Sequence, residues 1–247
     1  MKKAGGPILK SIDVAATALC ASLYAGIGYL TWPGIVCPGV GIVRFWPVVI
    51  IPAVFAYLFG PLVGGLGAAI GIFVSDMLIH GDPILSLSVG VPANFLGFYT
   101  VGYLSRKEVR ADHAIVMSTL VTYGLLFTIG FLGVTPEVVL IFVIVCLISF
   151  IAVVLALCIT PKWRSYHLAC TFGLLLGSAV IGVGVWAYSQ FFALPETVGG
   201  GFKLPMWAAL VLFIWTFSTE IPFMLVLGPP ILEACLRAYP YLAKRGA

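Results

Sequence analysis

Apolar residues fill most of the chain in long stretches, which short polar or glycine- and proline-containing turns separate. Eight such stretches are visible, at about 12–31, 45–59, 62–80, 88–105, 113–133, 137–159, 167–194 and 205–232. They lack the two-residue alternation of a membrane β-barrel, and a helix needs about 20 residues to cross a bilayer. The pattern predicts an all-α integral membrane protein, a polytopic helix bundle with eight membrane segments. Segment 45–59 is short for a crossing, and 167–194 is long enough to break near Gly182 or Gly184.

Composition supports this fold class. Hydrophobic residues make up 62% of the 247-residue chain and charged residues 9%, whereas about a quarter of a soluble domain is charged. So few polar side chains cannot cover a water-facing surface. No linker or low-complexity tail divides the sequence, so residues 1–247 are expected to form a single transmembrane domain.

The distribution of Lys and Arg predicts the topology. If the amino terminus is inside and the eight segments alternate, eleven of the thirteen basic residues fall on one side: Lys2, Lys3, Lys10, Arg106, Lys107, Arg110, Lys162, Arg164, Arg237, Lys244 and Arg245. Only Arg44 and Lys203 fall on the other side. The positive-inside rule makes the first side cytoplasmic, so both termini are expected in the cytoplasm. The net charge of +4 then reflects topology and contact with the lipid bilayer rather than nucleic-acid binding.

A glycine-rich stretch, "GPLVGGLGAAIGIFVSD" at residues 60–76, ends on a carboxylate. Glycines at 60, 64, 67 and 71 follow helical spacing and predict close packing against a neighbouring helix. Asp76 is placed about 22 Å along the helix at 1.5 Å per residue, within the outer leaflet. A carboxylate there costs several kcal/mol, on the order of 3, unless a polar cavity or a partner receives it.

The outer ends of the neighbouring segments offer partners for Asp76. Arg44 and Trp46 lie at the start of the second segment, Asn94 lies near the start of the fourth, and Trp32 follows the end of the first. Two interpretations stay open: an Arg44–Asp76 ion pair that joins two helices, or a small-molecule pocket that opens outward. Aromatic walls with a few convergent polar groups are typical of ligand pockets.

A second intramembrane acid lies in "TFSTEIPFM". Glu220 precedes Pro222, which removes a backbone hydrogen bond and leaves a carbonyl for nearby hydroxyls to satisfy. Glu220 is expected near the middle of the bilayer. It either closes the floor of the pocket or forms a hydrogen bond with a neighbouring helix.

Motifs for catalysis or metal binding are missing from the sequence. It has no H-E-x-x-H, no G-x-S-x-G, no paired aspartates and no phosphate-binding G-x-x-x-x-G-K-[ST] loop. The six cysteines form no C-x-x-C, and the three histidines are dispersed along the chain. We therefore expect no enzyme activity, no metal site and no cofactor.

Residues 43–78, with an "FGP" turn and a glycine-spaced helix ending in "D-x-L", and residues 94–107, "NFLGFYTVGYLSRK", resemble the substrate-binding S components of energy-coupling factor (ECF) transporters. The resemblance covers about residues 12–107. It implies a six-helix core within the eight segments, in a prokaryotic cell membrane, that captures a small water-soluble micronutrient such as a vitamin or its precursor. It also implies two kinds of partner, a transmembrane coupling subunit and a pair of cytoplasmic ATPases.

In that family the first helix carries A-x-x-x-A where the coupling subunit docks. Here Ala21 and Ala25 match, and Ala18, Ser22 and Gly26 continue the small surface at four-residue steps. The rival interpretation is an ion-coupled secondary transporter, in which Asp76 and Glu220 would be the coupling residues.

Overall fold

The structure, a computed structural model, describes residues 10–32, 34–107, 124 and 135–245. Six helical stretches in this part of the chain are long and apolar enough to cross a membrane: Ser11–Thr31 (α1), Pro61–Ile79 (α3), Pro83–Leu104, Pro136–Ala156 within α7, Arg164–Ser189 (α8) and Trp207–Ala238 (α9). The described residues contain no strand beyond two isolated bridges. An all-α, polytopic membrane protein is therefore confirmed. Of the predicted segment 113–133, the structure describes residue 124 alone.

Two segments depart from a simple spanning helix. The second begins with a 3-10 turn, Pro47–Val49 (η1), and continues as Ile50–Phe59 (α2), so it is short, as predicted. The fourth joins three pieces, Pro83–Leu85 (α4), a π-helical turn at Ser86–Gly90 (η2) and Val91–Leu104 (α5). The remaining helices are Pro136–Ile159 (α7) and the short turns Pro161–Trp163 (η3), Glu196–Val198 (η4) and Pro240–Arg245 (η5).

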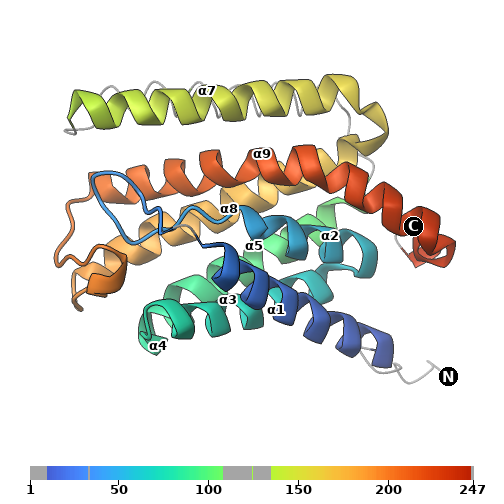
Figure 1. Cartoon of the computed structure of the whole chain (residues 1–247), viewed down its shortest axis with the longest axis horizontal. Helices are drawn as coiled ribbons and strands as arrows, with labels where there is room; N and C mark the ends of the chain where they lie inside the picture. Colours follow the sequence, from blue (N-terminus) through green and yellow to red (C-terminus); the bar gives the residue numbers. More distant parts are fainter. Residues whose placement is uncertain (1–9, 33, 108–123, 125–134, 246–247) are drawn as a thin grey trace, which may run out of the picture.

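The glycines of α3 let three neighbouring helices approach it closely. A methyl group on Gly67 would lie 2.6 Å from Sγ of Cys20 in α1. Gly64 lies against Ala56 of α2, and a methyl group on Gly65 would lie 3.1 Å from a phenylalanine ring of α5. Close packing was predicted, but the glycines serve several partners rather than one face. Helix α3 thus packs against α1, α2 and α5, on the side of the bundle away from α7 (Figure 1).

Helix α8 runs unbroken from Arg164 to Ser189, so the expected break near Gly182 or Gly184 is wrong. Gly182 instead lies against the carbonyl of Ala209 in α9, and a methyl group on Gly184 would lie 2.7 Å from Val89. These glycines are sites of helix contact rather than of helix breakage.

Helix α7 lies beside α9, on the side away from α1 (Figure 1). Pro222 inside α9 has no N–H to give to the carbonyl of Ser218, four residues earlier. The Oγ of Ser149 in α7 donates a hydrogen bond to that carbonyl. The freed carbonyl is therefore satisfied by a hydroxyl, as the sequence predicted, but the hydroxyl comes from another helix.

Two loops, 34–46 and 190–206, meet at one end of the bundle, which we call the outer end. The backbone N–H of Ile42 donates to the carbonyl of Val198. A methyl group on Gly41 would lie 3.1 Å from Cα of Gly199, so the two loops touch along their backbones. Because α2 is short, loop 34–46 also reaches into the bundle, where Phe45 contacts a ring of α9.

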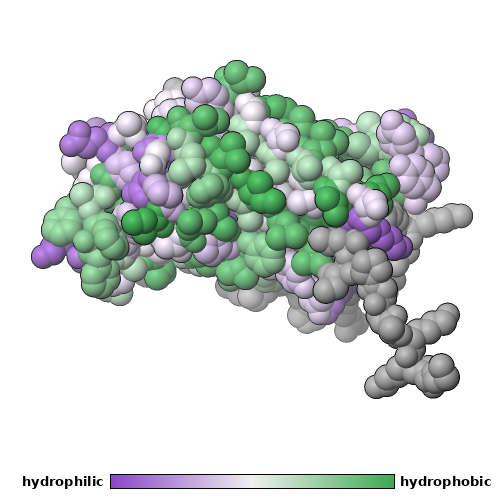
Figure 2. Space-filling view, turned by 90° about the horizontal axis from the view of Figure 1, so that it is seen from below, coloured by the Kyte–Doolittle hydropathy of each residue, from purple (hydrophilic) through white to green (hydrophobic). Residues whose placement is uncertain are grey.

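The opposite end, which we call the inner end, holds the start of α1 and the end of α9 (Figure 1). Lys162 and Arg237 pair there with Glu233, at 3.0 and 3.4 Å. Figure 2 shows apolar residues over the middle of the visible face, with hydrophilic residues mainly toward its two ends. This distribution is the one that a membrane-spanning bundle requires.

Candidate functional site

A cavity of about 110 Å³ lies below the two outer loops, within the core of α1, α3, α5, α8 and α9. Its lining includes five of the six residues predicted from sequence to bind substrate: Arg44, Trp46, Asp76, Asn94 and Glu220. Trp32 is not among the lining residues. It follows the last residue of α1 and packs, partly buried, against the core.

Asp76 and Arg44 form a buried ion pair on the cavity wall. Nη2 of Arg44 lies 2.6 Å from Oδ1 of Asp76, and both side chains are less than a tenth exposed. Asp76 lies three residues before the end of α3, and Arg44 reaches it from loop 34–46. The ion pair of the first interpretation is therefore present, and it lines a cavity. The second interpretation, that this cavity is a small-molecule pocket open to the outside, stays a prediction.

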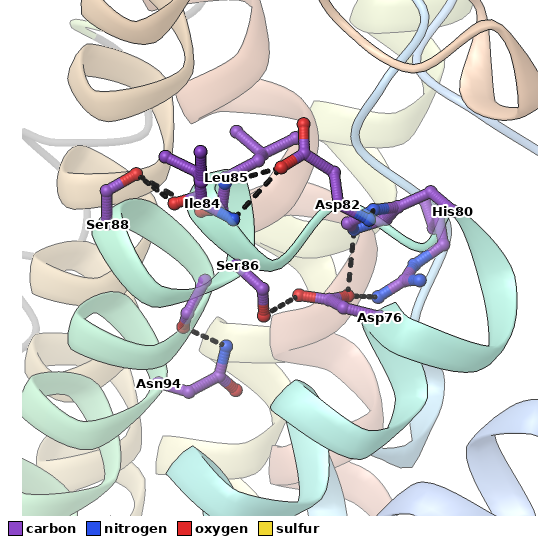
Figure 3. Close-up of polar contacts among 10 residues, drawn as sticks. Asp76, His80, Asp82, Ile84, Leu85, Ser86, Ser88 and Asn94 are labelled. Atoms are coloured by element: carbon purple, nitrogen blue, oxygen red, sulfur yellow. Dashed lines mark hydrogen bonds and ion pairs between the residues drawn. The ribbon is translucent and has the colours of Figure 1, made fainter.

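Two further groups hold the Asp76 carboxylate (Figure 3). Oγ of Ser86 donates a hydrogen bond of 2.6 Å to Oδ2, and Nε2 of His80 lies 3.5 Å from Oδ1. The backbone N–H of Asp82 donates to Nδ1 of His80, at 3.1 Å. With Nδ1 accepting, Nε2 carries the hydrogen and points it toward Asp76.

The π-helical turn η2 brings the fourth segment against this carboxylate. It places Ser86 at hydrogen-bonding distance, and a methyl group on Gly90 would lie 2.8 Å from Oδ2 of Asp76. Asp82 anchors the start of the segment by accepting hydrogen bonds from two backbone N–H groups of α4 and from the hydroxyl of Tyr188 in α8. A π turn inside a helix is frequent at functional sites.

Aromatic rings form a second wall of the cavity. The guanidinium of Arg44 lies 4.5 Å from the ring centroid of Trp46. Tyr24 meets Trp46 and Phe98 edge to face, with centroids 6.2 Å apart in each case. The Tyr24 hydroxyl donates to Oδ1 of Asn94 at 2.8 Å, which fixes the amide against α1.

Glu220, Thr216 and Ser178 line the side of the cavity that α8 and α9 provide, which we call the floor. Glu220 is thirteen residues into α9, about 20 Å along the helix at 1.5 Å per residue, and is 5% exposed. Within the described part of the chain it has no hydrogen bond and no ion pair. Its expected role in the pocket floor therefore agrees with its position, while the alternative of a hydrogen bond to a neighbouring helix does not.

Sequence reasoning missed three polar contributors. Tyr24 lies in the middle of α1, Ser86 in the fourth segment and Ser178 in α8, each within an apolar run. Isolated hydroxyls are common in membrane helices and carry little signal. The available clue to Ser86 was the Gly-Asp-Pro turn at residues 81–83, which folds the next helix back beside Asp76.

The small surface of α1 is divided between two environments. Ala21 and Ala25 are buried, and a methyl group on Gly71 of α3 would lie 2.9 Å from the Ala21 carbonyl. The other three predicted docking residues, Ala18, Ser22 and Gly26, are exposed. The A-x-x-x-A pattern thus serves packing inside the chain, and a partner can reach only the exposed three.

Metal-ligating side chains do not gather here. Within the residues that the structure describes, no group of three or more His, Cys, Asp or Glu could hold a metal ion.

Curated relatives of this chain are found in Lactococcus lactis subsp. cremoris, where they are named "UPF0397 protein". In two strains they are 32% identical to it over 126 residues, which span 47% of this chain and 68% of the relative. In a third strain the identity is the same and 65% of the relative is covered. No protein-family model and no solved structure matches the chain.

Proposed function

The chain belongs to the UPF0397 family, and we propose that it is the substrate-capture subunit of an ECF-type uptake system. The cavity below the outer loops would bind a small water-soluble micronutrient, a vitamin or its precursor. A transmembrane coupling subunit and a pair of cytoplasmic ATPases, all separate chains, would drive its release inside. In this proposal the protein catalyses no reaction and lies in a prokaryotic cell membrane with both termini in the cytoplasm.

One observation carries the proposal: the cavity combines aromatic walls with buried polar atoms that lack partners. Nη1 of Arg44, Nε1 of Trp46 and Oγ of Ser178 are buried without a hydrogen bond, and all three residues line it. A buried polar atom without a partner costs about 1–3 kcal/mol. A bound polar molecule supplies such partners, so the cavity is suited to capture rather than to packing.

A second candidate function is an ion-coupled secondary transporter that uses Asp76 and Glu220. The unpartnered Glu220 carboxyl favours it, because intramembrane acids often carry protons or bind sodium. The surroundings of Asp76 weigh against it. Arg44 and Ser86 occupy one carboxylate oxygen each, so Asp76 is held as a fixed anion rather than left free to exchange an ion.

Native mass spectrometry followed by an uptake assay tests the proposal. The purified protein is expected to carry a small molecule that is released on denaturation, and the labelled compound then serves as transport substrate. Uptake should stop when the ATPases are inactivated and continue when an uncoupler is added at constant ATP. The reverse pair of results identifies a secondary transporter. A protein that neither carries nor takes up any small molecule contradicts both.

The docking surface has its own test. Ser22 is exposed on α1, so a Ser22→Trp variant should no longer co-purify with the coupling subunit, while ligand binding by the isolated protein is retained. Ile148→Trp is the matched control, because Ile148 is exposed on α7, away from α1 (Figure 1). If both variants co-purify equally with the coupling subunit, the partner does not dock on this face of α1.

A further inference from the structure

Hydrogen-bond donors without partners are found on one side of the cavity. Nη1 of Arg44 and Nε1 of Trp46 are both buried and unpaired, and the guanidinium lies over the indole ring. Guanidinium and indole nitrogens can only donate. A ligand must therefore present an acceptor, such as a carbonyl oxygen or a ring nitrogen, on this side.

The floor has the opposite character. Glu220 exposes a carboxyl group without a hydrogen bond among the described residues. The Thr216 hydroxyl donates its hydrogen to the Leu212 carbonyl at 2.8 Å, so only its lone pairs are left for the cavity. The Ser178 hydroxyl is unpaired and can accept as well. The floor thus offers acceptor lone pairs at all three residues, and the Ser178 hydroxyl can also donate.

The two acids of the cavity differ in their charged neighbours. Asp76 is paired with Arg44, so that pair adds no net charge. Glu220 lies within electrostatic range of Arg44 but forms no ion pair with it. A carboxylate buried in the membrane interior is costly without a cation or several N–H donors beside it. A buried carboxyl group without such a partner takes the neutral, protonated form. A cationic or N–H-donating ligand beside Glu220 would stabilise the ionised form instead.

Size and shape limit the ligand further. An apolar protein cavity of about 150 Å³ holds one benzene ring, and this cavity is smaller, at about 110 Å³, so one small ring is the most that it can hold. The rings of Tyr24 and Trp46 line the cavity, and so do Gly97 and Gly177, where the backbones of α5 and α8 pack against each other. This geometry fits one flat ring better than a branched or extended molecule.

Resting on the proposed capture function, we propose that the cavity selects a compact single-ring base, with a cationic or N–H-donating group on Glu220 and an acceptor facing Arg44 and Trp46. Glu220 is then the residue that sets specificity for charge. Asp76 acts through Arg44 and positions its guanidinium.

Three probes of one shape and different charge test this inference on the purified full-length protein: benzamidine (cationic), benzamide (neutral) and benzoate (anionic). Benzamidine should bind at least tenfold more tightly than benzamide, and benzoate most weakly, by calorimetry or thermal shift. Glu220→Gln keeps the shape and should reduce the preference for benzamidine to less than threefold. Glu233→Gln is the same change on the same helix, outside the cavity, and should keep the wild-type order.

Several results would overturn the inference while leaving the capture function intact. They are benzoate binding as tightly as benzamidine, an unchanged preference in Glu220→Gln, no binding of any probe, or an acidic compound as the co-purified ligand. The capture function fails on a different result, the absence of any co-purified or transported small molecule. The two failures are therefore distinguishable.

Discussion

On the wall of the cavity, the Asp76 carboxylate receives hydrogen bonds from Arg44 and Ser86, whereas on the floor the Glu220 carboxyl has no such partner among the described residues. The two acids are equally buried, at 5% exposure. They differ in their neighbours. Both acids line the cavity, but Asp76 also contacts a loop cation and a π-helical turn, whereas Glu220 has no such contact among the described residues.

This difference separates structure from recognition. A satisfied buried network fixes the positions of its members, because breaking one contact leaves another group unpaired. A group without a partner in the protein adds no hydrogen bond between protein groups, and a ligand can supply that partner. We expect substitutions on the wall to change stability most, and substitutions on the floor to change affinity most.

The largest effect is expected at the ion pair. Arg44→Gln leaves Asp76 as a buried anion without its cation, and removing one partner of a buried pair costs about 3–5 kcal/mol. The melting temperature of the ligand-free protein measures this loss. The double variant Arg44→Gln, Asp76→Asn removes both charges and should recover part of it.

An exposed pair provides the control for this comparison. Arg237→Gln makes the same change where Arg237 meets Glu233, and that arginine side chain is 80% exposed. It should leave the melting temperature almost unchanged, because water screens exposed pairs. If Arg44→Gln is equally mild, the wall does not stabilise the fold.

Ser86→Ala should have the next largest effect. It removes a 2.6 Å hydrogen bond to a carboxylate, and hydrogen bonds to charged groups contribute about 1.5–3 kcal/mol. Ser88→Ala is the matched control two residues away, because the Ser88 hydroxyl bonds only to backbone carbonyls of its own segment, those of Ile84 and Leu85. Equal melting temperatures for the two variants would show that Ser86 does not support Asp76.

The sequence predicted much of this wall and less of its surroundings. Long apolar runs determine where the helices lie. An acid and an arginine at the same depth in a membrane favour an ion pair, so the pairing of Asp76 with Arg44 could be predicted from the sequence. The hydroxyls of Ser86 and Tyr24 could not, because their roles depend on how the π turn and α1 are rotated. Rotation follows from packing between segments distant in sequence, such as Gly71 against Ala21.

A smaller effect is expected from Gly90→Ala, which tests how closely the π turn must approach the wall. The new methyl group would lie 2.8 Å from Oδ2 of Asp76. Overpacking destabilises a protein by about 1–3 kcal/mol, whereas replacing glycine by alanine within a helix stabilises the helix by about 1 kcal/mol. A net loss of about 1 kcal/mol should appear in the melting temperature. A gain in stability would mean that the turn can move away from Asp76 freely.

The smallest effect on stability, and the sharpest contrast with the wall, is expected from Glu220→Gln in the ligand-free protein. No hydrogen bond or ion pair of the described structure is lost, and a neutral amide is cheaper to bury than a carboxylate. The free energy of unfolding without ligand should therefore stay within about 1 kcal/mol of the wild-type value, because one polar group without a partner replaces another. The melting temperature of the ligand-free variant measures this. With benzamidine present, the melting temperature of the variant should be lower than that of the wild type, because the variant lacks the group that the cation contacts. If Glu220→Gln destabilises the empty protein as strongly as Arg44→Gln does, Glu220 belongs to the structural network, and the division between wall and floor is wrong.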